Sequence, residues 1–98
     1  MTNTPTNKPV IKGKFVVGNE RGLHTRPSTE LVKLASSFKS HVFLIYQKQA
    51  VNAKSLLGIL MLAATKGARI TIEAEGEDAE EAVESIVQLA KNHFHVDF

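Results

Sequence analysis

The chain has 98 residues, which is enough for one compact domain and too few for two. It lacks cysteine, which excludes disulfides and thiolate metal sites, and its net charge of +2 comes without a long basic stripe, which argues against a nucleic-acid partner. The longest apolar run, Leu56 to Ala64, has nine residues, about half of a bilayer span, and no secretory signal opens the chain. We therefore expect a cytoplasmic protein without membrane insertion.

The first part of the chain predicts an extension, a strand and a helix. Residues 1–9 have almost no apolar side chains, which predicts a flexible extension ahead of a single domain over residues 10–98. Val10 to Val17 has the loose alternation and β-branched residues of a strand. Thr25 to Phe38 has apolar residues at helical spacing, and Pro27 is tolerated because first-turn N–H groups have no partner within a helix.

The middle of the chain predicts a hairpin followed by a short helix. His41 to Tyr46 is rich in β-branched and aromatic residues, and Gln47-Lys48 is a plausible two-residue turn before a returning strand, Ala50 to Ala53. A helix over Ser55 to Ala64 follows, because serine is a favoured N-cap. Gly67, which readily adopts a left-handed conformation, is expected to end this helix.

The last part of the chain predicts a strand and a third helix. Ala68 to Glu75 alternates between apolar and polar residues, as in a strand with one solvated side. Glu77 to Asn92 has acidic residues in its first turn and an apolar stripe, as in an amphipathic helix. The order β-α-β-β-α-β-α indicates an α+β fold, in which helices cover one face of a four-stranded antiparallel sheet.

The segment Gly22-Leu23-His24-Thr25-Arg26-Pro27 carries the strongest chemical signal. It places a histidine at the start of the first predicted helix, where N–H groups and the helix dipole attract anions. Arg26 can donate two hydrogen bonds to phosphate oxygens, and a ring nitrogen of His24 that lacks a proton can accept a phosphoryl group. The residues alone leave two interpretations open: a phosphoryl acceptor, or a histidine that simply caps the helix or sits half exposed.

The other histidines have no such surroundings. His41 begins a strand and is expected at the surface. His93, His95 and Asp97 alternate in the C-terminal tail and have the donor types of a metal site, but tails are usually mobile. We therefore expect solvated residues there, with neither a metal site nor a cofactor.

Two motifs resemble the HPr family, the histidine phosphocarriers of the bacterial phosphoenolpyruvate-dependent phosphotransferase system. The histidine segment is similar to the family's phosphorylation signature, and Asn52-Ala53-Lys54-Ser55-Leu56-Leu57-Gly58 is similar to its regulatory serine motif. The resemblance extends over Lys12 to Phe94. It implies an open-faced β-sandwich of four antiparallel strands and three helices, which agrees with the order of elements expected from the pattern.

The resemblance also implies a function. His24 would accept a phosphoryl group on Nδ1 from phosphorylated enzyme I and pass it to a IIA protein, with Arg26 steadying the phosphate. The chain would act as an intermediate in phosphoryl transfer and not as a stand-alone enzyme. Ser55 would be a target of HPr kinase/phosphorylase. We also expect a monomer.

The second predicted helix is apolar on nearly every side, so it is either buried or a docking surface. A small domain has little room to bury it, and we expect Leu56, Leu57 or Leu60 to be partly exposed and to contact partners. Thr25, Arg26 and Lys33 are expected around the same surface, where basic residues suit acidic partner faces.

Two other functions remain as alternatives at this point. One is a regulatory HPr-like protein, controlled through Ser55 or belonging to the nitrogen-related branch, that acts by binding partners and not in sugar uptake. The other is a small RNA-binding domain, which would need exposed aromatic residues and a basic groove that the sequence lacks.

Overall fold

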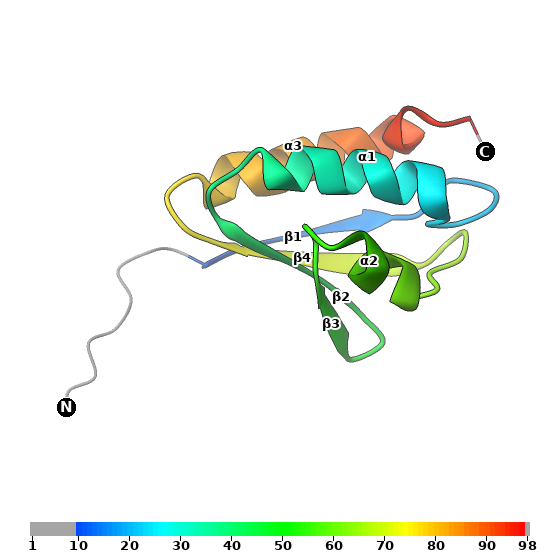
Figure 1. Cartoon of the computed structure of the whole chain (residues 1–98), viewed down its shortest axis with the longest axis horizontal. Coiled ribbons are helices and arrows are strands. Elements are labelled where there is room, and N and C mark those ends of the chain that lie inside the picture. Colours follow the sequence, from blue (N-terminus) through cyan, green and yellow to red (C-terminus); the bar gives the residue numbers. More distant parts are fainter. Residues whose placement is uncertain (1–9, 98) are drawn as a thin grey trace.

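The computed structural model describes residues 10–97 and has the element order expected from the sequence (Figure 1). Four strands and three α-helices are followed by a short 3₁₀ segment at the C-terminal end. Their bounds are β1 Val10–Val16, α1 Thr25–Ser36, β2 His41–Tyr46, β3 Gln49–Asn52, α2 Leu56–Met61, β4 Arg69–Glu75, α3 Ala79–Lys91 and η1 His93–His95. No helix in this part of the chain is long and apolar enough to span a bilayer.

The four strands form one antiparallel sheet in the order β1-β4-β2-β3. The alternation in β4 is as expected: Ile70, Ile72 and Ala74 are buried, whereas Arg69 lies on the exposed face. The helices pack on the apolar face and leave the other face open, which gives two layers (Figure 1). The expected α+β open-faced sandwich is confirmed.

The hydrophobic core lies between the sheet and the helices. Its fully buried side chains come from every layer, including Leu31 of α1, Leu44 of β2, Ile72 of β4 and Ile86 of α3. Burying a side chain of this size contributes about 1.5–3 kcal/mol relative to leaving it exposed. The core therefore fixes α1 and α3 against the sheet, and with them the first turn of α1.

The second helix is shorter than predicted. It ends at Met61, and Ala63 takes a left-handed conformation with φ of 51°. The helix therefore stops six residues before Gly67, which has φ of +89° but lies in the following turn. The cause is tertiary packing, because Leu62 and Ala64 are both buried and the carbonyl of Ala64 accepts a hydrogen bond from the N–H of Leu23.

An ionised carboxylate connects two loops at the C-terminal end of α1. Asp78, the N-cap residue of α3, accepts hydrogen bonds from the N–H of Lys39, the N–H of Ser40 and the hydroxyl of Ser40. These bonds favour the charged form, so the pKa of Asp78 falls from 3.8 to about 2, with the Ser40 hydroxyl the largest cause. The hydrogen bonds of Asp78 therefore hold the loop before β2 to the start of α3 without any ligand.

Candidate functional site

The loop before α1 is anchored to the loop after α2. Gly22 has φ of +70°, and a Cβ atom at this position would lie 2.4 Å from the carbonyl oxygen of Ala64. The next N–H, that of Leu23, donates to the same oxygen at 2.9 Å. Only glycine fits so close an approach with a positive φ. This close contact fixes the path of the backbone into α1.

His24 is the N-cap residue of α1 and is half-buried. Its carbonyl accepts the first hydrogen bond of the helix from the N–H of Ser28, at 3.1 Å. Its side chain makes no capping hydrogen bond, which removes the simple interpretation of a capping histidine. Ser28 is fully buried and its hydroxyl donates to the carbonyl of Leu23, which holds the backbone on either side of His24.

The three α-helices differ in what occupies their N-termini. In α2 the hydroxyl of Ser55 accepts the N–H of Gly58 at 3.0 Å. In α3 the first turn contains Glu80 and Glu81. The first turn of α1 contains no acidic residue, and its N-cap side chain does not cap it. Because a helix N-terminus attracts negative charge, α1 has the N-terminus best suited to an anion brought by another molecule.

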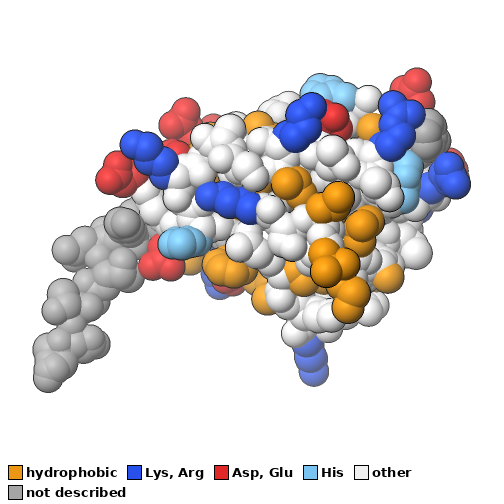
Figure 2. Space-filling view, in the orientation of Figure 1, with side chains coloured by type: hydrophobic (Ala, Val, Ile, Leu, Met, Phe, Trp, Pro, Cys, Tyr) orange, Lys and Arg blue, Asp and Glu red, His pale blue; other side chains and the backbone are white. Residues whose placement is uncertain are grey.

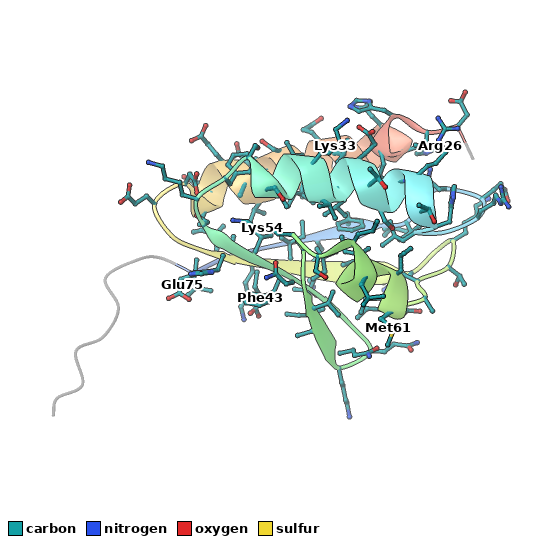
Figure 3. The ribbon with its side chains drawn as sticks, viewed as in Figure 1. Arg26, Lys33, Phe43, Lys54, Met61 and Glu75 are labelled. Atoms are coloured by element: carbon teal, nitrogen blue, oxygen red, sulfur yellow. The ribbon has the colours of Figure 1, made fainter. Side chains whose placement is uncertain are left out.

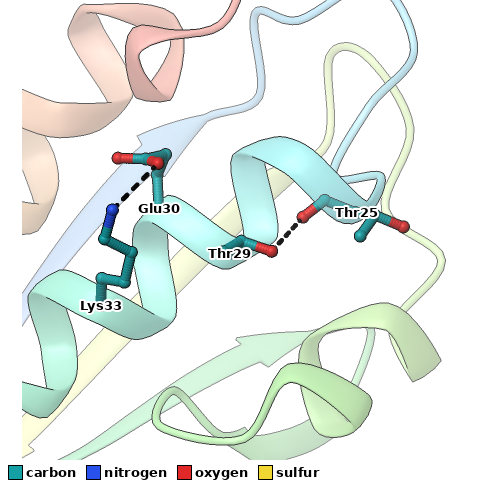
Figure 4. A network of polar contacts seen from close by, with 4 residues as sticks. All are labelled: Thr25, Thr29, Glu30 and Lys33. Atoms are coloured by element: carbon teal, nitrogen blue, oxygen red, sulfur yellow. Dashed lines mark hydrogen bonds and ion pairs between the residues drawn. The ribbon is translucent and has the colours of Figure 1, made fainter.

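Thr25 and Arg26 are exposed and follow His24 in the first turn of α1. Arg26 lies at the N-terminal end of α1, next to the C-terminal segment (Figure 3), and lines a groove of about 240 Å³. The hydroxyl of Thr29 donates to the carbonyl of Thr25 at 2.7 Å, a local bond that leaves the first turn helical (Figure 4). An exposed guanidinium group is thus held in the first turn of α1, two residues after His24.

Lys33 lies away from the place expected for it. It forms an ion pair with Glu30 at 3.6 Å (Figure 4) and lines a groove between α1 and α3. In Figure 3 its side chain extends on the side of α1 opposite to Met61 of α2. Arg26, Glu30 and Lys33 recur at the spacing of one helix face. That face lies beside α3 and the C-terminal segment, so Lys33 does not border α2.

An exposed apolar patch covers α2, and we call Leu56, Leu57, Leu60 and Met61 the α2 patch. Figure 2 shows hydrophobic side chains gathered on this side of the molecule. Leu57 and Met61 are 70% and 63% exposed, and Leu56 and Leu60 are half-buried. The expected exposure of the leucines is confirmed, and Met61 is a member that the sequence-based choice of residues missed. The bond from Leu23 to Ala64 joins the backbone that leaves this helix to the loop of His24.

The remaining histidines lie at the surface. His41, His93 and His95 are exposed, and residues 10–97 contain no group of three or more histidine or acidic side chains arranged to hold a metal ion. The C-terminal segment itself is packed, unlike the mobile tail that we expected. Phe94 is fully buried and its ring meets that of Phe15 edge-on, with centroids 5.6 Å apart.

The comparisons with known proteins agree on one family. The family described as "PTS HPr component phosphorylation site" matches residues 11–92. The chain is 35% identical to the phosphocarrier protein HPr of Xylella fastidiosa over 90% of this chain and 99% of that protein. It is 38% identical to HPr of Neisseria meningitidis, over 87% and 96% of the two chains. A crystal structure of HPr from Thermoanaerobacter tengcongensis superposes with a TM-score of 0.85 at 34% identity, covering 90% of this chain and 99% of that one.

Proposed function

The chain belongs to the HPr family of phosphocarriers of the phosphotransferase system, and from this premise we propose that His24 receives a phosphoryl group from phosphorylated enzyme I and delivers it to IIA proteins. One observation carries the proposal. His24 is a half-buried histidine at the N-terminus of a helix whose first turn has no acidic residue, and its side chain does not cap that helix.

The chemistry needs a ring nitrogen with a lone pair. Nδ1 of His24 attacks the phosphorus atom of the phosphohistidine on enzyme I, and a new N–P bond forms while the old one breaks. The electron pair of the broken bond returns to the histidine of enzyme I, and Nε2 of His24 keeps its proton throughout. Delivery to a IIA histidine is the same exchange in reverse, so neither step requires a metal ion or another cofactor.

Arg26 and the start of α1 act on the charge that moves. A guanidinium donates hydrogen bonds to phosphate oxygens, and the dipole of α1 favours an anion at this end. Arg26 and Thr25 are exposed and His24 is half-buried, so this end of α1 would hold the phosphoryl group without enclosing it. A carrier needs this balance, because tight binding would slow delivery to the next protein.

The α2 patch is the proposed docking surface for enzyme I and IIA proteins. It offers exposed apolar area beside the loop of His24, and Thr25 lies exposed at the start of the neighbouring helix. Exposed apolar patches on small proteins are typical of protein–protein contacts. Replacing Leu57 and Met61 with alanine should raise the KM of enzyme I for the chain and leave the thermal midpoint unchanged, because both side chains are largely exposed.

Ser55 is the proposed regulatory site, modified by HPr kinase/phosphorylase. Its oxygen lies at the N-terminus of α2, directly before the α2 patch. A phosphate there would add about −1.5 to −2 charge, which a helix N-terminus tolerates and an apolar docking surface does not. The fold would be retained while partners met a dianion. Labelling by ATP and the kinase, lost in Ser55→Ala, tests this site separately from His24.

The main test is phosphorylation from phosphoenolpyruvate. The chain is incubated with labelled phosphoenolpyruvate and enzyme I, and a phosphate that is labile in acid and stable in base is expected on His24. His24→Ala should abolish the label, whereas the matched control His41→Ala should keep it, because His41 lies exposed at the start of β2. A label that survives His24→Ala would show the assignment to be wrong. A chain labelled only by ATP would support the regulatory function instead.

A further inference from the structure

The C-terminal segment folds into a turn with an unusual backbone. His93, Phe94 and His95 have φ of 53°, 56° and 60°, three successive left-handed residues of which none is glycine. Such residues are costly for L-amino acids and persist only where the surroundings fix them. We call residues 93–96 the C-terminal turn.

Asn19 is the polar group that holds the C-terminal turn. Its side-chain amide donates to the carbonyl of His93 and to the carbonyl of Val96, both at 3.0 Å. Asn19 is only 1% exposed, so the two bonds are shielded from water and their loss is not compensated by solvent. The buried ring of Phe94 adds an apolar anchor against Phe15.

The same asparagine belongs to the loop that leads to His24. Its carbonyl accepts the N–H of Gly22 at 2.9 Å, which closes a tight turn immediately before Leu23 and His24. The preceding residue, Gly18, faces the ring of His93 so closely that a Cβ atom there would lie 2.9 Å from Nε2. The loop and the C-terminal turn are therefore packed together on either side of Asn19.

The C-terminal turn also forms one wall of the groove beside Arg26. His95 and Val96 line that groove, and Arg26, Thr29 and Glu30 line it from α1. Any change in the position of the turn changes the space open to the guanidinium. The buried side chain of Asn19 thus connects the loop that leads to His24 with one wall of the groove beside Arg26.

We propose that Asn19 is a positioning residue for phosphoryl transfer, which clamps the C-terminal turn to the loop of His24 and so fixes the imidazole and the groove of Arg26 relative to each other. The inference rests on the proposed function of His24. Asn19 does not touch the phosphoryl group. It acts through the backbone of its loop and through His95 and Val96, and no role in partner docking is assigned to it.

The test measures steady-state transfer from enzyme I to the full chain in three variants. Asn19→Asp has nearly the same shape but lacks the N–H donors, and Asn19→Ala removes the side chain. Asn92→Ala is the matched control, because the amide of Asn92 also donates to a backbone carbonyl, that of Gln88, outside the C-terminal turn. Asp78→Ala is the stability control, because it removes a loop clamp at the other end of α1.

Both Asn19 variants should lower kcat about tenfold while the KM of enzyme I for the chain changes less than twofold, because a displaced acceptor slows the reaction and the α2 patch is intact. Asn92→Ala and Asp78→Ala should keep the kcat of the original chain. The His24 ring signals in ¹⁵N spectra should shift in both Asn19 variants and in neither control.

Three results would overturn the proposal. One is an unchanged kcat in Asn19→Asp, and another is an equal fall in kcat in the stability control. The third is a change in KM alone, which would place Asn19 in docking. The proposed function fails differently, since the unmodified chain would then take no label on His24 at all.

Discussion

The helices α1 and α3 are neighbours that run antiparallel, so their N-termini lie at opposite ends of the pair (Figure 1). The two N-termini differ in the charged side chains that they carry. The N-terminus of α3 carries Glu80 and Glu81 in its first turn, and its N-cap residue is the carboxylate of Asp78. The N-terminus of α1 has no acidic residue in its first turn and has Arg26 beside its N-cap histidine. The N-terminus of α3 is balanced by acidic side chains of the chain itself, whereas the N-terminus of α1 is suited to an anion brought by another molecule.

Under the proposed function, the difference marks where this small domain gives up stability for phosphoryl transfer. An acidic residue at a helix N-terminus contributes about 0.3–1 kcal/mol, and α1 forgoes this contribution. The same absence keeps negative charge away from the phosphoryl group proposed on His24. A helix N-terminus that lacks its usual acids, next to a histidine and an arginine, is therefore a feature to look for in other sequences.

Making α1 resemble α3 should have the largest effect. Thr25→Glu places a carboxylate in the first turn, and its repulsion of a phosphoryl dianion about 6 Å away in a water-like medium is ~1.4 kcal/mol, roughly tenfold in transfer rate. The same change should raise the free energy of unfolding by about 0.3–1 kcal/mol, because it complements the helix dipole. Stopped-flow transfer and urea denaturation measure the two effects.

Thr25→Gln is the matched control, since it has the shape of the glutamate without its charge. It should leave the transfer rate within about twofold of the original. A glutamate variant that is stabilised and transfers at the original rate would contradict the idea that α1 is kept free of acids for function.

Removing the carboxylate from the α3 end should affect stability alone. Asp78→Ala loses three accepted hydrogen bonds and should lower the thermal midpoint by several degrees at pH 7, with the transfer rate unchanged. Because the pKa of Asp78 is lowered from 3.8 to about 2, its contribution is fully present above pH 4 and is lost as the pH falls toward 2.

Thermal unfolding of both chains between pH 7 and pH 2 checks this sign. The difference in midpoint between the original chain and Asp78→Ala should shrink as the pH falls. A constant difference over that range would mean that the charged form of Asp78 is not the stabilising one.

The N-terminus of α2 has no acidic residue in its first turn but is capped by the side chain of Ser55. A change there should have the smallest effect on stability and transfer. Ser55→Ala removes one capping hydrogen bond, that from the N–H of Gly58, and should cost about 1 kcal/mol of unfolding free energy. Urea denaturation measures this cost. Phosphoryl acceptance on His24 should stay at its original rate, and a loss of that rate would place Ser55 in the transfer step.

Much of the fold follows from local patterns. The alternation in β4 predicted its buried and exposed faces, and the turn at Gln47 and Lys48 formed as expected with φ of 50° and 68°. Neither turn residue is glycine or asparagine, so the pairing of β2 with β3 supports a backbone that the residues alone disfavour. The histidine motif located the candidate site because its chemistry lies within six consecutive residues.

The rest could not be predicted because it depends on contacts between distant segments. The apolar run after Met61 looks helical, but Ala64 must meet Leu23, so the helix ends early. Asn19 has no local signal, and its partners lie more than 70 residues away in the C-terminal turn. The place of Lys33 follows from which side of α1 faces α3, a property that helical spacing alone does not decide.

The C-terminal turn bears on how this protein is handled at the bench. His95 and Val96 lie beside Arg26, while the described chain begins with Val10 at the far end of the sheet (Figure 1). A purification tag or surface attachment fused after residue 98 would therefore pull on the region next to the imidazole. Fusion on the N-terminal side leads into Val10, which lies at the far end of the sheet from Arg26, and this makes it the better choice for immobilisation and kinetic assays.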